Sequence, residues 1–425
     1  MPVFFYALGN VLLYNKIHVL EVREGERYMW KNKNVILIFI GEFIVGVGLW
    51  LGIIGNLEFM QKHVPSDFVK SLILFSGLLA GVIVSPIAGR WIDTYAKKHI
   101  LLYAGIGRIC SVVFMLFALK YESIFLMVCF MVLIQVAAAF YFPTLQAIIP
   151  LVVADEKQLM TVNGIHMNIS ALSRIFGTAF GGALLMITSL QMLYVGSMIA
   201  YILLFLLTFF IDIKEEKRET KHNTKEKQRF TDIFPIIRQL PIVYIAVVLT
   251  IVPQLFIGGF NLMVINISEL QHDPSIKGWL YTIEGIGFLF GAFFIKYAAH
   301  EKAYIKWMYA LTCFIAFAQL SLHFAHIKWV SLVSFGLFGI CVGCFFPMIA
   351  TIFQTNVPKL YHGRFFSFKN MFDRVTFQTV LLASGLLLDT VGLEYMVVLF
   401  GMLSLLLIMY TLFRKKGNVL KSEGA

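Results

Sequence analysis

The stretch GRWIDTYAKKH, Gly89 to His99, joins two apolar runs near 68–92 and 99–119. Each run is long enough to cross a membrane, since a helix needs about 20 apolar residues for roughly 30 Å of hydrocarbon. Lys97 and Lys98 are typical of a cytoplasmic turn, because Lys and Arg accumulate on that side of membrane proteins. This preference applies only to basic residues and does not explain an acidic residue in the turn, so Asp93 needs another explanation.

Apolar runs of this length recur along the whole chain. Twelve such runs are present, and an even number of spans places both termini on one side of the membrane. The basic residues gather in alternate turns, notably at 97–98, 214–229 and 414–416, so the sequence predicts cytoplasmic termini in a multi-pass protein of the cytoplasmic membrane. The twelve candidate spans lie near 35–57, 68–92, 99–119, 124–149, 163–187, 189–211, 240–264, 278–298, 305–324, 329–352, 367–389 and 393–413.

Composition supports an all-α membrane protein and argues against other classes. Of the 425 residues, 59% are hydrophobic and 14% are charged, whereas soluble domains carry about 25% charged residues. The net charge of +11 follows from cytoplasmic basic turns, so we expect no nucleic-acid partner. The five cysteines lie inside apolar runs without metal-ligand or disulfide-framework spacing, and we expect no metal and no cofactor.

The two halves of the chain repeat weakly. FYFPTLQAII at 140–149 matches CFFPMIATIF at 344–353 in frame, with Pro143 aligned on Pro347 about half the chain length apart. This predicts two six-helix halves, a layout of alternating-access transporters. The predicted parts are a cytoplasmic tail 1–34, an N-terminal half 35–212, a cytoplasmic linker 213–238, a C-terminal half 239–413 and a cytoplasmic tail 414–425.

The N-terminal tail leaves the translation start open between Met1 and Met29. Residues 3–14 are too short an apolar run to span a membrane, and they lack the features of a signal peptide. Codons for Glu24-Gly25-Glu26 can contain a ribosome-binding sequence shortly before Met29. We therefore expect translation to begin at Met29, with an interfacial segment at 1–28 as the alternative.

The pattern Gly89-x-x-x-Asp93-x-x-x-Lys97-Lys98, between spans two and three, resembles the loop signature of the major facilitator superfamily. The resemblance implies that Gly89 lets span two approach span eleven, and that Asp93 lies against the cytoplasmic end of span eleven. A carboxylate there is stabilised by the helix dipole and free N–H groups. At the repeat spacing, Phe293 and Tyr297 replace the glycine and the aspartate, so we expect a single conformational latch.

Two further motifs resemble the twelve-span drug-exporter branch that includes macrolide and siderophore exporters. Span five carries Gly177, Gly181 and Gly182, similar to the G-P-x-x-G-G of exporters, although Thr178 replaces the proline and span four has no arginine. Close helix packing in lipid explains these glycines equally well. The turn VPKLYHGRFFS at 357–367 resembles the branch's V-P-x-x-x-x-G-R-x-x-S.

Charged residues inside the spans are candidates for proton coupling or for binding substrate charge, because each needs a partner or a watery cavity. A carboxyl group removed from water holds a proton more readily, which favours Glu42 and Glu284. The alternatives are buried ion pairs of these acids with Arg108 or Arg174, and a local pair of Asp373 with Lys369. The six candidates are Glu42, Glu284, Asp373, Arg108, Arg174 and Arg374.

The sequence therefore predicts a secondary active exporter of amphipathic small molecules, driven by a proton gradient and acting as a monomer in the bilayer. A facilitator or importer of a metabolite or lysolipid is the alternative. An enzyme fits least well, because the sequence has no P-loop, no H-E-x-x-H and no G-x-S-x-G.

Overall fold

The computed structural model describes residues 32–153, 156–213, 237, 239–298, 304–358 and 362–423. Within these ranges it does not describe the side chains of residues 93, 156–161, 163–164, 296–298, 362–364, 367 and 415–423. The start at Met1 or Met29 and most of the predicted linker therefore lie outside the described residues. The domain boundaries stay predictions.

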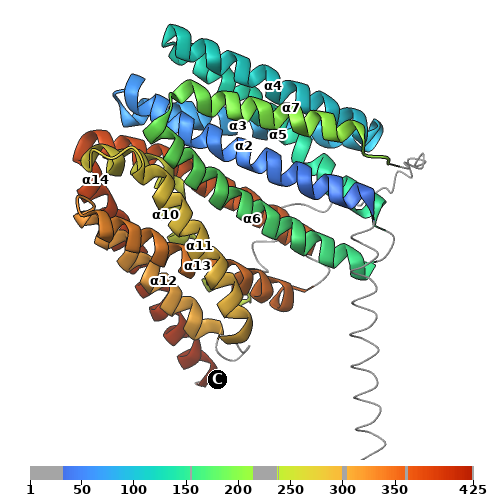
Figure 1. Cartoon of the computed structure of the whole chain (residues 1–425). Helices are drawn as coiled ribbons and strands as arrows, with labels where there is room; N and C mark the ends of the chain where they lie inside the picture. Colours follow the sequence, from blue (N-terminus) through green and yellow to red (C-terminus); the bar gives the residue numbers. More distant parts are fainter. Residues whose placement is uncertain are drawn as a thin grey trace, which may run out of the picture.

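Six long helices form the first half of the molecule, shown from blue to green in Figure 1. Short polar turns join them, and serine side chains cap several starts: Ser66 accepts from the backbone N–H of Val69, and Ser123 from that of Leu126. The helices are α2 (Lys33–His63), α3 (Asp67–Thr94), α4 (Lys97–Tyr121), α5 (Ile124–Val152), α6 (Glu156–Ile187) and α7 (Leu190–Phe209).

The second half is also entirely helical within the described residues. One of its spans is divided into α9 and α10 by a break at Thr250. Pro253 explains the break, because it cannot donate a hydrogen bond to the carbonyl of Leu249, four residues earlier. The elements are α9 (Pro241–Leu249), α10 (Ile251–Leu270), α11 (Ile276–Ala298), α12 (Tyr304–Ser321), the 3-10 turn η3 (Leu322–Phe324), α13 (Lys328–Asn356) and α14 (His362–Glu423).

Helix α14 contains the last two predicted spans. Gly392 interrupts it with φ 80° and ψ 173°, a conformation open almost only to glycine. The chain reverses there: Lys369 before the break lies over the Phe353 ring, and Tyr410 after it meets Tyr244. Eleven described helices are long and apolar enough to cross a membrane. With α14 counted as two spans, the predicted twelve-span all-α fold is confirmed.

The halves diverge from one another toward the lower right of Figure 1 and meet toward its left. We call the end of the bundle near Phe209 and Pro241 the linker end, and the other end the opposite end. Contacts between the halves join α6 to α11, α3 to α14, and α2 to α10. The polar contacts at the opposite end that join the halves include Asn266 to Asp67 (3.1 Å), Lys70 to Glu269 (3.8 Å) and Lys277 to Glu58 (2.7 Å).

Candidate functional site

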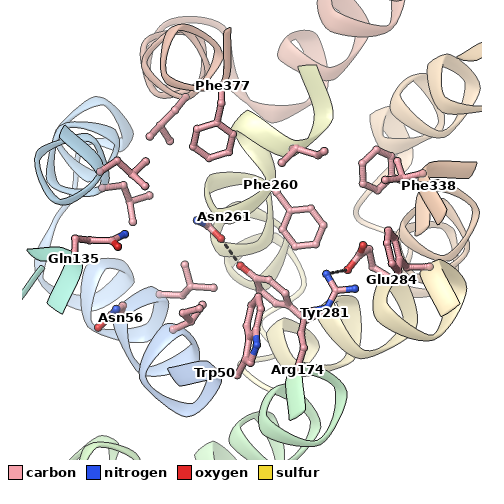
Figure 2. Close-up of a pocket in the computed structure, with 18 of the residues that line it drawn as sticks. Trp50, Asn56, Gln135, Arg174, Phe260, Asn261, Tyr281, Glu284, Phe338 and Phe377 are labelled. Carbon is pink, nitrogen blue, oxygen red and sulfur yellow. Dashed lines mark hydrogen bonds and ion pairs between the residues drawn. The ribbon is translucent and has the colours of Figure 1, made fainter. Parts of the chain in front are cut away.

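A cavity of about 370 Å³ lies between the two halves, and Figure 2 shows its lining. Most of the lining is aromatic or aliphatic, which is typical of small-molecule sites. Both halves contribute, so any molecule in the cavity contacts both. The aromatic lining residues are Trp50 from α2, Phe260 from α10, Tyr281 and Phe288 from α11, Phe338 and Phe346 from α13, and Phe377 from α14.

The cavity contains an ion pair that joins the halves. Arg174 Nη1 of α6 lies 3.0 Å from Glu284 Oε2 of α11, and both residues line the cavity. The Arg174 guanidinium also lies 5.9 Å from the Trp50 ring and 5.7 Å from the Phe288 ring. The Glu284 side chain is only 7% exposed. The structure thus brings together two of the predicted charged residues, as the ion-pair alternative described.

Uncharged polar side chains complete the lining. The Tyr281 hydroxyl donates to Asn261 Oδ1, as Figure 2 shows. Asn56 accepts a hydrogen bond from the Tyr194 hydroxyl at 2.8 Å, and Gln135 also lines the cavity. The sequence interpretation missed these amides because it considered only charged residues. An amide inside an apolar run was the available signal, since such groups seldom face lipid.

A second compartment of about 510 Å³ continues toward the linker end. It shares Leu78, Gln135, Ile257 and Phe377 with the central cavity. Two predicted residues, Asp373 and Arg374, line it. Lys369 donates to both oxygens of Asp373 at 2.6 Å, so Asp373 makes the local ion pair considered above.

The other two predicted charges lie within the first half. Glu42 is 3% exposed and Arg108 is 1% exposed, and neither lines the two cavities described above. The partner of Glu42 is His166, whose Nε2 lies 3.6 Å from Oε2. Arg108 stacks 4.3 Å from the Tyr141 ring, and its three side-chain nitrogens have no hydrogen-bond acceptor among the described residues. The ion pairs of the described residues join Glu42 neither to Arg108 nor to Arg174.

The three glycines of span five lie at close contacts of α6. A Cβ on Gly182 would stand 2.8 Å from the Gly278 Cα in the other half. Gly177 packs against Trp50, and Gly181 against Ile54, both in α2. In the structure these glycines therefore make close helix packing, and one of them does so between the halves.

The predicted latch lies at the linker end of α3. An ideal Cβ on Gly89 would meet no described atom within 4 Å, so no helix packs closely on it here. Lys97 begins α4, and Lys98 donates to the carbonyl of Phe209 at the end of α7 at 2.8 Å. The side chain of Asp93 lies outside the described part of the chain, and its role stays a prediction.

One buried ion pair between the halves was not predicted from sequence. Lys277 Nζ contacts Glu58 Oε2 at 2.7 Å, with the two side chains 0% and 6% exposed. Both residues fell just outside the predicted spans 35–57 and 278–298. The helices α2 and α11 extend past those limits, to His63 and from Ile276. If each apolar window had been extended by one helical turn, both residues would have fallen inside the predicted spans.

Comparison with known proteins agrees with this architecture. The family model described as Major Facilitator Superfamily matches residues 38–270 and 254–424. A relative from Bacillus subtilis (strain 168), the uncharacterised MFS-type transporter YfiS, is 23% identical over 411 residues. That alignment covers 92% of this chain and 95% of the relative.

Solved structures of several transporters share the fold. A bacterial homologue of the iron transporter ferroportin, in an inward-facing state, matches with a TM-score of 0.70 and 12% identity over 89% of this chain and 98% of that one. The nucleoside transporter NupG matches with a TM-score of 0.65 and 13% identity, covering 89% and 98%. Twelve spans in two halves, a cavity between them and the match along nearly the whole chain lead to one conclusion: this protein belongs to the major facilitator superfamily, a family of membrane transporters.

Proposed function

We propose that this protein is a secondary active exporter of amphipathic small molecules, coupled to proton entry through the cytoplasmic membrane, with both termini in the cytoplasm. The observation that carries the proposal is the central cavity, which is lined by aromatic rings from both halves and contains the Arg174–Glu284 pair. Flat apolar groups fit such a lining, and a charged group of the substrate can meet one member of the pair.

The chemistry of the cavity favours an amphipathic substrate over a strongly polar one. Seven aromatic side chains line it, against three amides and one ion pair that is already satisfied internally. A small hydrophilic substrate would need many more hydrogen-bonding groups to replace its lost hydration. The sequence motifs Gly177 to Gly182 and Val357 to Ser367 support export, through the resemblance to the drug-exporter branch.

Proton coupling is assigned to Glu42. Its carboxylate is buried in the first half, and its Oε2 has no hydrogen bond. An ionisable residue buried inside a membrane bundle is a candidate functional residue by default, which supports Glu42 as the proton carrier. The groups around it are His166 from α6, Arg108 from α4 and Tyr141 from α5, the last of which interacts electrostatically with both Glu42 and Arg108. Loading and release of a proton would change the charge balance of this buried group.

The test uses inside-out membrane vesicles with an acidic lumen and a panel of fluorescent amphipathic dyes. We expect dye to accumulate in the lumen, and accumulation to stop when the pH gradient is collapsed. Glu42→Gln should abolish the dependence on the gradient while leaving dye binding intact. Glu122→Gln, which changes an exposed acid in a turn, is the matched control and should behave like the unchanged protein.

Three outcomes would contradict the proposal or a part of it. Dye movement that reaches only equal concentrations and ignores the gradient would identify a facilitator. Accumulation in right-side-out vesicles alone would identify an importer, the alternative with a metabolite or lysolipid as substrate. If Glu42→Gln retains full gradient dependence, the proton is carried by another residue.

A further inference from the structure

Helix α3 of the first half begins at a carboxylate of the second half. Asp389 of α14 accepts three hydrogen bonds there: from Ser66 Oγ at 2.6 Å, from the backbone N–H of Asp67 at 2.6 Å, and from that of Phe68 at 3.0 Å. The first backbone N–H groups of a helix have no partner within the helix, and the helix dipole favours negative charge at this place. Asp389 therefore links the two halves at the opposite end.

A glycine one turn earlier makes this contact possible. A Cβ on Gly385 would lie 2.5 Å from Ser71 Oγ, 2.7 Å from Ser71 Cβ and 2.8 Å from the carbonyl oxygen of Asp67. Any larger residue would force α3 and α14 apart. Gly385 and Asp389 are thus a pair, in which one residue permits the close approach and the other binds the helix end.

The short sequence pattern that contains Gly385 and Asp389 in α14 also occurs at the C-terminal end of α3. Residues 385–390 read GLLLDT and residues 89–94 read GRWIDT, so both follow G-x-x-x-D-T. Each pattern lies at the C-terminal end of its span. The threonines also behave alike: Thr94 donates to the carbonyl of Arg90 at 2.7 Å, and Thr390 to that of Leu386 at 2.8 Å.

The two copies are related by the contact between α3 and α14, which run in opposite directions. Asp389 ends its span beside the first turn of α3, and Asp93 ends α3 on the side where α14 begins at His362. The pattern is not found by the chain repeat, which aligns Gly89 with Phe293 of α11. The expectation of a single latch rests on that repeat alone, which does not reach the G-x-x-x-D-T pattern of α14.

We propose that Gly385 and Asp389 form a second gating latch, which holds the opposite end closed and alternates with the Gly89–Asp93 latch at the linker end. The proposal goes beyond substrate and coupling, and rests only on alternating access between two halves. In the structure the two glycines differ: Gly385 is packed tightly on Ser71, whereas Gly89 faces open space among the described atoms.

The alternation has a mechanical reason. Helices α3 and α14 both run the length of the bundle, so a rocking motion that brings their opposite ends together separates their linker ends. One copy of the pattern can be engaged at a time. Weakening one latch must then shift the equilibrium toward the state held by the other, because the ratio of the two states depends on their difference in free energy.

The experiment measures distances between spin labels in detergent or lipid nanodiscs, without any substrate. One label pair reports the opposite end (Glu122→Cys with His326→Cys), and a second pair reports the linker end (His99→Cys with Gln354→Cys). All four positions are exposed. The background lacks the cysteines that are at least partly accessible, namely Cys110, Cys129 and Cys313.

Asp389→Asn and Gly385→Ala should each widen the opposite end and narrow the linker end. For Asp389→Asn we expect the ratio of the two states to change by about 5- to 30-fold, the combined effect of losing one charge at the helix end and weakening three hydrogen bonds to it. Asp93→Asn should shift the ratio the other way. The double variant Asp93→Asn with Asp389→Asn should return it to within about threefold of the starting value, since independent changes add.

Glu394→Gln is the matched control, because it removes an exposed acid from the same helix close to Asp389. The proposal is overturned if Asp389→Asn changes the ratio no more than this control, even when it lowers the melting temperature, since a purely structural helix cap would do that. It is also overturned if Asp389→Asn and Asp93→Asn shift the ratio in the same direction. Neither result depends on the proposed substrate or on proton coupling.

Discussion

Replacing Gly278 by alanine tests whether the contact between α6 and α11 stabilises the state closed at the opposite end. An ideal Cβ on Gly278 would lie 2.6 Å from the carbonyl oxygen of Thr178 and 2.7 Å from the Cα of Gly182. Both are backbone atoms of a helix and cannot rotate away. The two helices would have to separate by roughly 1 Å to restore ordinary van der Waals contact.

Overpacking of this kind costs about 1–3 kcal/mol. The cost applies only where α6 and α11 are in contact, so it falls on the closed state and not on a state in which their ends have parted. The ratio of closed to open molecules should therefore fall by about 5- to 150-fold. The spin-label pair at Glu122 and His326 measures this ratio directly as two distance populations.

Gly81→Ala is the control, since a Cβ there would meet its nearest neighbours, atoms of Gln135, at 3.6 and 3.8 Å. Both substitutions raise helix propensity by about 1 kcal/mol, and the comparison cancels that effect. The reasoning is refuted if Gly278→Ala leaves the distance populations equal to those of Gly81→Ala. A shift toward the closed population would refute it equally.

Three further substitutions test individual contacts by thermal unfolding of the purified protein. Glu284→Gln removes the partner of Arg174 and should lower the free energy of unfolding by about 1–3 kcal/mol. This is less than the 3–5 kcal/mol typical of a fully buried pair, because the Arg174 side chain is 22% exposed. Adding Arg174→Gln should recover most of the loss, and no recovery would show that the two residues are not coupled. Lys277→Met removes the buried partner of Glu58 and leaves only the exposed Lys62, 3.0 Å away, so we expect a loss of about 1–3 kcal/mol, less than for a buried charge without any partner. An unchanged melting temperature would mean that Lys62 alone compensates this carboxylate. Gly392→Ala places a side chain in a conformation that favours glycine and should lower the free energy of unfolding by about 1–3 kcal/mol. An unchanged melting temperature would show that the turn changes its conformation to accept alanine.

The fold could be predicted closely from the sequence because membrane spans are recognised by length and apolarity alone. The windows at 35–57 and 329–352 fall inside α2 and α13, which run past them at both ends. The ends of the helices could not be predicted, since a helix continues beyond its apolar window wherever the polar side chains there form ion pairs or hydrogen bonds. Glu58 and Lys277 are the example: each extends its helix by pairing with the other.

For the candidate site, the sequence identified charged residues but not their partners. Glu284, with two arginines available to it in the first half, pairs with Arg174, whereas Arg108 stacks on Tyr141 without an acceptor. These choices depend on how each helix is rotated about its axis and on which helix of the other half it meets. A single apolar span carries little periodic signal for that rotation, because lipid and protein interior are both apolar.

The sequence by itself determined the number of spans, the division into two halves and the resemblance to a transporter family, because these depend on local composition and on short patterns. The family resemblance already implied that span two approaches span eleven. Only the tertiary structure decided that Asp389 of GLLLDT binds the start of the helix that ends in GRWIDT. Residues 66 and 389 are far apart in the chain and belong to different halves. Their hydrogen bonds form only where the two halves meet at one end of the bundle, and this pairing leaves no local pattern in the sequence.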